Sequence, residues 1–291
     1  MSLVEEALRR LQSQAKARAL AEASGAAAAA VAPEAHALVK DRFLLSPSRK
    51  TIFSASRTDP ISLAWSIQQA PVLSSQMRAL RREISDALRE LDNSGNGRVV
   101  LISSALPNDG KTFTSIAVAR TLGSDSRTKV TLIDGDLPKR NLTRLFGLEA
   151  APGLADCFAG KVPLADIVYR TDVDGINFIP AGTWTPDAAD HFASSRLDDL
   201  LVVLRSAGPE HVFVMDSTPV LAAGESVYGA ARADLVIMIA RANETPCGAV
   251  VEAIRKLSVA TRLGLVLNGH TTGAISRYYG YTDSYDHASG S

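Results

Sequence analysis

Cysteine and histidine are too few and too widely spaced in this sequence to suggest a metal site or a disulfide framework. The 291 residues include two cysteines, Cys157 and Cys247, without CxxC spacing. The five histidines show no HExxH-type pair. We therefore expect both cysteines to be small buried hydrophobic residues in a reducing compartment, and we expect neither a disulfide nor a cysteine nucleophile.

Net charge and long apolar runs are also lacking. The 31 basic and 31 acidic residues give a formal net charge of zero, so composition provides no electrostatic reason to expect nucleic acid or an anionic membrane as a partner. No apolar run approaches the roughly 18 to 20 residues that cross a bilayer, and the N-terminus "MSLVEEALRRLQSQ" lacks a signal-peptide core. We expect a cytoplasmic protein without a direct membrane span.

The hydrophobic residues that are present, 46% of the chain, suffice for one sizeable domain with appendages. Residues 1–24 are predicted to hold an amphipathic helix that docks on a partner or on a second copy, a frayed terminus being the alternative. Residues 25–73 are low in complexity and rich in Pro and Ser, which predicts a flexible linker. The helix pattern of residues 1–24 rests on Val4, Leu8, Leu11 and Ala15.

Residues 74–270 have the pattern of an α/β domain. A helix is predicted over "SSQMRALRREISDALREL", with Arg78 and Arg81 off its apolar face. Short apolar runs then alternate with helical stretches, which predicts a mostly parallel sheet with helices on both faces, as in P-loop NTPases. Ligands of such sheets bind at the carboxyl ends of the strands. The runs lie at 98–105, 129–136, 175–182, 211–218, 233–241 and 262–269.

The segment after the first run is predicted to bind phosphate. "Gly110-Lys111-Thr112" stands between a strand and a helix, where glycine allows close approach, the lysine adds positive charge and the threonine hydroxyl can bind Mg²⁺. Ala105 occupies the first glycine position of the strict motif, so a simple glycine turn is the alternative. The predicted nucleotide contacts are Pro107, Asn108, Asp109, Gly110, Lys111, Thr112 and Phe113.

Acidic residues end two of the neighbouring runs. Asp216 ends "HVFVMD", the position expected of a Walker B aspartate that holds Mg²⁺. Asp134 and Asp136 end "KVTLIDGD" two steps apart, so they are predicted to project on the same side. Each could instead cap a helix, although three such residues beside one phosphate loop weaken that alternative. Asn268 closes the last run and is a candidate to read adenine, or simply a turn residue.

These motifs resemble those of the cytoplasmic tyrosine kinases of bacterial polysaccharide export, the BY-kinases. "LPNDGKT" resembles their Walker A loop, "VTLIDGDLPKR" their Walker A′ motif and "VFVMDSTPVL" their Walker B motif. The closing "SRYYGYTDSYDHASGS" is similar to their autophosphorylated tail, and "RLFGLEAAPGLADCFAG" also looks like family sequence. The short start without membrane spans is similar to stand-alone kinases of exosortase-linked exopolysaccharide loci.

The resemblance implies an ATP- and Mg²⁺-dependent tyrosine autokinase that regulates exopolysaccharide synthesis or export. It implies phosphorylation in trans within a closed ring that uses the Arg78 helix, a membrane polysaccharide copolymerase as activator and an opposing tyrosine phosphatase. Recruitment to the inner face of the cell membrane would follow from that partner. Residues 271–291 are predicted to be a mobile tail, because their composition cannot offset the entropy of ordering. Its predicted acceptors are Tyr278, Tyr279, Tyr281 and Tyr285.

For catalysis, we expect Lys111 to neutralise charge on the transferring group. Either Asp134 or Asp136 would accept the tyrosine proton, and the sequence leaves that choice open. Pro138 stands where the family has an arginine, with Lys139 and Arg140 just after it. Ser75 stands where the family's helix motif has a glutamate, which puts the subunit contact in doubt.

Two rival functions differ in class. A positioning ATPase of the chromosome-partitioning kind shares the Walker A′ architecture, but its signature lysine would fall at Leu106. A nucleotide-binding scaffold without catalysis is motivated by Pro138 and the missing glutamate.

Overall fold

The structure is a computed structural model that describes residues 49–50, 71–91, 96–173 and 175–270. The predicted helix of residues 1–24 and the four predicted acceptor tyrosines lie outside the described residues. So does the predicted linker, apart from Arg49–Lys50 and residues 71–73. None of the helices within the described part of the chain is long and apolar enough to cross a membrane.

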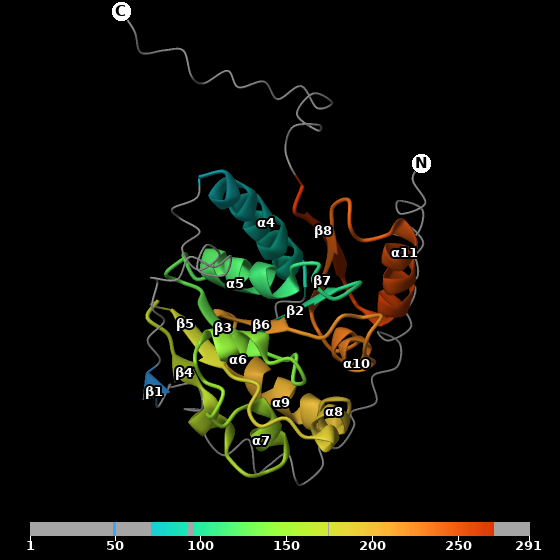
Figure 1. Ribbon diagram of the computed structural model, residues 1–291. Helices are drawn as coiled ribbons and strands as arrows, with labels where there is room; N and C mark the ends of the chain where they lie inside the picture. The colour runs from blue at the N-terminus through green and yellow to red at the C-terminus, as the bar shows by residue number, and fades with distance from the viewer. Residues whose placement is uncertain (1–48, 51–70, 92–95, 174, 271–291) are drawn as a thin grey trace, which may run out of the picture.

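A single eight-stranded sheet, in the order β1-β4-β5-β3-β6-β2-β7-β8, forms the centre of the described residues (Figure 1). All neighbouring strands are parallel except β4 and β5, which are antiparallel. The mostly parallel α/β fold predicted from the sequence is confirmed. The strands are β1 (Arg49–Lys50), β2 (Arg98–Ser104), β3 (Lys129–Asp134), β4 (Tyr169–Arg170), β5 (Ile176–Ile179), β6 (His211–Asp216), β7 (Leu235–Arg241) and β8 (Leu263–Asn268).

Helices cover both faces of the sheet, as Figure 1 shows with α4 and α5 on one side and α7, α8 and α9 on the other. Two buried apolar clusters follow from this arrangement, one on each face. The helices are α4 (Pro71–Arg89), α5 (Lys111–Leu122), α6 (Asn141–Leu145), α7 (Leu154–Phe158), α8 (Pro186–Phe192), α9 (Ser195–Arg205), α10 (Glu225–Ala230) and α11 (Cys247–Lys256), with short 3-10 turns η2 (Leu164–Ile167) and η3 (Leu257–Val259).

Helices α4 and α5 differ in pattern because they occupy different layers. On α4 the buried residues Met77, Ile84 and Leu88 form one stripe at helical spacing, and the remaining face is exposed. On α5 nearly every residue from Thr114 to Leu122 is buried, because α5 lies between α4 and the sheet. This double burial fixes the start of α5 against the carboxyl ends of the central strands.

The cysteines differ from the prediction that both are buried. Cys157 on α7 is half-buried, and Cys247 is exposed. Cys247 begins α11 directly after Pro246, at the end of a helix where only one side can pack on the sheet. That part of the sequence prediction is wrong for Cys247.

Candidate functional site

The loop between β2 and α5 has the backbone shape of a phosphate-binding loop. Gly110 adopts φ +99°, a left-handed conformation that favours glycine. A Cβ atom on Gly110 would lie 2.0 Å from Nδ2 of Asn268, so the close approach of β8 also requires glycine here. Within the described residues, no side chain caps the start of α5, so the first backbone N–H groups of the helix can donate hydrogen bonds to a phosphate held in the loop.

The shape of this loop is held from outside by the end of β8 and the segment before α11. The two carboxylate oxygens of Asp109 accept hydrogen bonds from the Leu106 N–H at 2.8 Å and the Thr245 hydroxyl at 2.7 Å. Asn268 donates from Nδ2 to the Asp109 carbonyl at 2.9 Å. The Asn268 amide nitrogen, a candidate to read adenine, is therefore bonded to the loop itself.

The remaining predicted loop residues lie on its outer side. Pro107 and Asn108 are exposed, and Asn108 adopts φ +69°. Arg241 donates to the Asn108 carbonyl at 3.2 Å, which ties the loop to the end of β7. Phe113 is half-buried and packs against the apolar cluster beneath α4.

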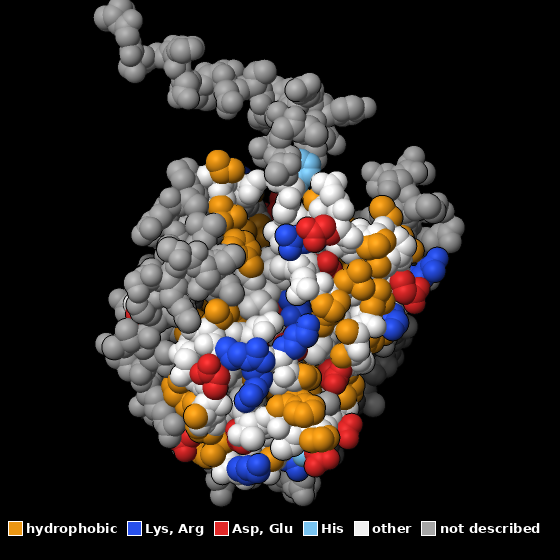
Figure 2. All heavy atoms as spheres, viewed as in Figure 1, with side chains coloured by type: hydrophobic (Ala, Val, Ile, Leu, Met, Phe, Trp, Pro, Cys, Tyr) orange, Lys and Arg blue, Asp and Glu red, His pale blue; other side chains and the backbone are white. Residues whose placement is uncertain are grey.

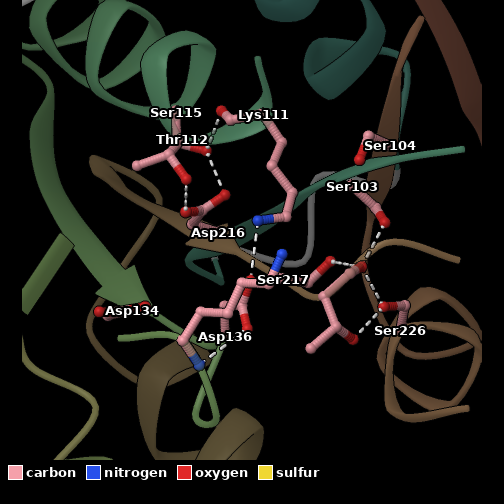
Figure 3. A network of polar contacts seen from close by, with 12 residues as sticks. Ser103, Ser104, Lys111, Thr112, Ser115, Asp134, Asp136, Asp216, Ser217 and Ser226 are labelled. Carbon is pink, nitrogen blue, oxygen red and sulfur yellow. Dashed lines mark hydrogen bonds and ion pairs between the residues drawn. The ribbon is translucent and has the colours of Figure 1, made fainter. Parts of the chain in front are cut away.

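Lys111 extends from the start of α5 across the carboxyl ends of the strands to Asp136 (Figure 3). Its Nζ lies 2.8 Å from Oδ2 of Asp136, and the side chains are only 7% and 1% exposed. Burial alone would lower the pKa of Lys111, but the carboxylates of Asp216 and Asp136 outweigh it and raise the pKa. Lys111 is therefore a buried cation at neutral pH.

Asp216, at the end of β6, bonds to the first turn of α5. Its Oδ2 accepts from the Thr112 hydroxyl at 2.7 Å, and its Oδ1 accepts from the Ser115 hydroxyl at 3.1 Å. Burial raises the pKa of Asp216 to about 6, although the charge of Lys111 and the bond from Thr112 act in the opposite direction. A carboxylate and a hydroxyl thus meet at the position where Mg²⁺ would be expected.

Asp134 and Asp136 have different partners, and Figure 3 shows Asp134 well away from the Lys111–Asp136 pair. Oδ2 of Asp134 accepts from the backbone N–H and the hydroxyl of Thr143, at 2.8 and 2.7 Å. The Thr143 hydroxyl in turn accepts from the Ala181 N–H at 2.8 Å. Asp134 is therefore turned toward α6 and the segment after β5. Asp134 and Asp136 were predicted to project on the same side, but they bond to different partners, Thr143 and Lys111.

Asp134 is nevertheless close to Asp216, because the two residues are register partners on β3 and β6. Burial and then the charge of Asp216 raise the pKa of Asp134 to about 7. Its Oδ1 atom is buried and has no hydrogen-bond partner in the described part of the chain. Asp134 is thus a carboxyl group for which ionisation is costly.

The protein atoms at this site would supply only some of the ligands of a Mg²⁺ ion bound with a nucleotide. Within the described residues, no three His, Cys, Asp or Glu side chains come close enough to hold a metal ion. Mg²⁺ at phosphoryl-transfer sites commonly takes one or two protein oxygens and fills its shell with waters and phosphates. The Thr112 hydroxyl and Asp216 would supply those protein oxygens, and Lys111 with the α5 amides would contact the phosphates.

A basic segment follows Asp136. Lys139 donates its N–H to Oδ1 of Asp136 at 3.3 Å, and Arg140 donates from Nη1 to the Gly182 carbonyl at 3.3 Å. Arg140 adopts φ +51° at the start of α6. Figure 2 shows Lys and Arg side chains gathered over α6 and the segment beside it. The basic groups after Pro138 are thus positioned beside the site, whereas Pro138 itself offers no charge.

Three residues that sequence reasoning missed support the site: Ser115, Thr143 and Thr245. Ser115 stands four residues after Lys111 on α5, a spacing that places both side chains on one face of the helix and could have indicated an inward-facing hydroxyl. Thr143 and Thr245 offer no comparable signal, because their partners lie 9 and 136 residues away in the sequence.

Arg78 is exposed on α4, and Arg81 is half-buried beside the segment that follows α5. Arg78 donates to the Ser74 hydroxyl at 2.6 Å, and Arg81 lies 3.5 Å from the Ser124 hydroxyl. Neither has a carboxylate at ion-pair distance among the described residues. Ser75, which stands at the position of the glutamate in the family's helix motif, is exposed on the same helix.

Relatives found by comparison with known proteins are named as tyrosine-protein kinases. No protein-family model matches the chain. It is 30% identical over 222 residues, 72% of this chain and 29% of the relative, to a Ralstonia solanacearum protein named as tyrosine-protein kinase EpsB. The chain spans about three tenths of the length of the curated relatives it matches.

Two solved structures share the fold. The kinase domain of the Escherichia coli tyrosine kinase ETK matches with a TM-score of 0.60 at 25% identity, over 68% of this chain and 76% of that one. The kinase domain of VpsO matches with a TM-score of 0.58 at 30% identity, over 69% of this chain and 98% of that one. The similarity therefore covers nearly all of a solved kinase domain.

Proposed function

The chain belongs to the bacterial tyrosine kinases, the BY-kinase family, and from that premise we propose that it transfers the γ-phosphate of ATP to tyrosines of its own C-terminal cluster. The proposed acceptors are Tyr278, Tyr279, Tyr281 and Tyr285. We further propose that the reaction occurs in trans between subunits and regulates exopolysaccharide synthesis or export.

The observation that carries this proposal is the meeting of three groups at the start of α5. The Thr112 hydroxyl lies 2.7 Å from Asp216, and Lys111 is a buried cation beside both. Phosphoryl transfer depends mostly on positioning and on stabilising charge, and these groups supply both. Mg²⁺, held by Thr112 and Asp216, would neutralise charge on the phosphate oxygens.

Asp136 is the better candidate for the base. Its carboxylate lies 2.8 Å from Nζ of Lys111, the group expected to contact the transferring phosphate, whereas the Asp134 carboxylate is bonded to Thr143. In the proposed step, the tyrosine oxygen bonds to the γ-phosphorus and the bond from that phosphorus to the β,γ-bridging oxygen breaks. ADP leaves with that electron pair, and the phenolic proton passes to Asp136.

The partners of the reaction are also proposals. Membership of the family supports self-association into a ring that uses the α4 arginines. It also supports a membrane polysaccharide copolymerase as activator, which would recruit the protein to the inner face of the membrane, and a tyrosine phosphatase that removes the modification. The zero net charge gives no support for a nucleic-acid partner.

The proposal is tested by incubating the purified protein with Mg-ATP and mapping phosphotyrosine by mass spectrometry. We expect label in the C-terminal cluster and none in a variant with all four tyrosines changed to Phe, which keeps the aromatic rings. Label at the parental level in that variant would place the acceptors at Tyr169 or Tyr228, the only other tyrosines. No label in the parent would favour a nucleotide-binding scaffold instead.

Asp134→Asn and Asp136→Asn, compared in the same assay, test the choice of base. We expect Asp136→Asn to lose label and Asp134→Asn to retain most of it. The reverse result would move the role of base to Asp134.

A further inference from the structure

The groove between α4 and the Ser124–Thr128 segment contains an excess of arginine. Its volume is about 480 Å³, and its lining includes five arginines and two aspartates, a net charge of +3. The five arginines are Arg78, Arg81, Arg82, Arg89 and Arg127. The chain as a whole is neutral, so this local excess is not a reflection of composition.

Two of these arginines form ion pairs with aspartates. Arg89 lies 3.2 Å from Asp86, and Arg127 lies 3.2 Å from Asp125. Among the described residues, no carboxylate lies at ion-pair distance from the other three, Arg78, Arg81 and Arg82. The unpaired charge therefore lies on α4.

The three unpaired arginines share one face of α4 at spacings of three and four residues. Like charges at these spacings destabilise a helix by about 0.2–0.5 kcal/mol per pair. Ser75 and Ser85, which also line the groove, add no negative charge. An anion that enters the groove would relieve this repulsion, and grouped guanidinium groups bind phosphate in bidentate fashion.

We infer that this groove binds the phosphorylated C-terminal tail of the same subunit, an inference that rests on the proposed function for the origin of the phosphate. Each phosphotyrosine adds roughly −1.5 to −2 charge at neutral pH, so two of them would match the groove's excess. Arginine clusters are the common means of recognising phosphorylated peptides. Without phosphate, residues 271–291 contain one Arg and two Asp and have little charge to offer.

The tail is long enough to reach the groove. It continues from Asn268, which bonds to the phosphate loop at the start of α5, whereas the groove is lined by Leu122 at the end of α5. The 12 residues of α5 separate the two points by about 18 Å along the helix. The eight residues that follow His270, up to Tyr278, span at most about 26–29 Å when extended.

This occupancy would link phosphorylation to assembly. Arg78 and Arg81 are the residues proposed to contact a neighbouring subunit, and a phosphorylated tail bound to them would compete with that contact. Phosphorylation would then release subunits by occupying a particular surface, in addition to adding general repulsion.

The test uses a synthetic peptide of residues 276–291, so that binding does not depend on whether the protein is a kinase. The full-length protein, treated with phosphatase, should bind the peptide phosphorylated at all four tyrosines at least about tenfold more tightly than the unphosphorylated peptide. Equal affinities would overturn the inference. Failure of the peptide to bind while the protein still labels its own tyrosines would reject the groove and leave the proposed function standing.

A matched pair of variants locates the site. Arg81→Gln/Arg82→Gln should weaken phosphopeptide binding about tenfold or more, whereas Arg255→Gln/Lys256→Gln, which removes the same charge from the last turn of α11, should change it little. Nucleotide affinity, measured on the same samples, confirms that each variant is folded. Equal losses in the two pairs would show that only net charge matters, and the inference would fail.

Two further measurements test whether the tail of the same subunit occupies the groove. Protein carrying its own phosphotyrosines should bind added phosphopeptide about tenfold more weakly than the phosphatase-treated protein, because its own tail fills the groove. Equal binding would exclude occupancy by the tail of the same subunit. If the Arg81/Arg82 variant instead lost binding to phosphatidylglycerol vesicles and kept its affinity for the peptide, the groove would be a membrane contact and the inference would be wrong.

Discussion

Replacing Gly110 with Ala tests the structure of the phosphate loop directly. The new methyl group would lie 2.0 Å from Nδ2 of Asn268, and the residue would have to keep φ +99°. The left-handed backbone costs roughly 1–2 kcal/mol for a residue with a Cβ atom. Displacing the Asn268 amide also breaks its bond to the Asp109 carbonyl, worth about 0.5–1.5 kcal/mol. We therefore expect Gly110→Ala to lower the free energy of unfolding by about 2–3 kcal/mol and to weaken nucleotide binding.

A double-mutant cycle with Asn268→Ala separates the two contributions. Asn268→Ala alone should cost about 0.5–1.5 kcal/mol, because only the hydrogen bond is lost. Asn268→Ala also removes Nδ2 and Cγ, the two atoms of Asn268 that would lie nearest to the added methyl group, at 2.0 and 3.1 Å. The double variant should therefore be more stable than the sum of the two single changes predicts, by about 0.5–1.5 kcal/mol.

The assay is denaturant unfolding of the four proteins, with ADP affinity measured by calorimetry on the same samples. Strict additivity of the unfolding free energies would show that the Asn268 side chain does not lie against Gly110. The account of how β8 shapes the loop would then be wrong.

Three further changes test the rest of the site. Lys111→Met should reduce tail phosphotyrosine about a hundredfold or more, because it removes the buried positive charge beside Asp136 and Asp216. Unfolding measured in parallel separates that loss from loss of fold, and undiminished label would remove Lys111 from the mechanism. Asp134→Asn should raise the free energy of unfolding by up to about 4 kcal/mol at pH 8. The Asp134 carboxyl has a pKa of about 7 in the folded state and roughly 3.9 in the unfolded state, so above pH 7 its ionisation destabilises the folded protein. That advantage should shrink as the pH falls and vanish near pH 4, and melting curves that keep a constant difference would refute the assignment. The double change Arg78→Ala/Arg81→Ala should shift any oligomer toward monomer, although an exposed ion pair contributes only about 0–1 kcal/mol. Light scattering that shows no change would mean that these arginines only interact with solvent at the surface.

The sheet could be predicted from sequence because its central strands are nearly continuous apolar runs. All six predicted runs contain strands of the sheet, and the helix after the phosphate loop begins at Lys111 as expected. The two missed strands, β1 and β4, are two residues long, and so short a segment shows neither a run nor an alternation.

The site was less predictable than the fold. The residue types at the strand ends followed from the chemistry of phosphate binding, and the structure brings Lys111, Thr112 and Asp216 together. The direction in which each side chain points could not be predicted from the sequence. Asp134 and Asp136 stand two positions apart, yet one bonds to Thr143 and the other to Lys111, because β3 ends at Asp134 and Asp136 lies beyond the strand, just before a turn at residues 137–139.

The bonds from Thr245 and Asn268 to Asp109 bear on the order in which this protein becomes competent during synthesis. The phosphate loop emerges from the ribosome well before the residues that hold it, which follow 136 and 159 positions later. Chains are made at roughly 5–20 residues per second, so the loop is made about 7–30 seconds before its outer supports. A nascent chain, or a proteolytic fragment that lacks β8, would contain the whole sequence from Ala105 to Thr112 and still lack the contacts that shape it. The ability to bind nucleotide would therefore be acquired among the last steps of folding, after most of the sheet is made.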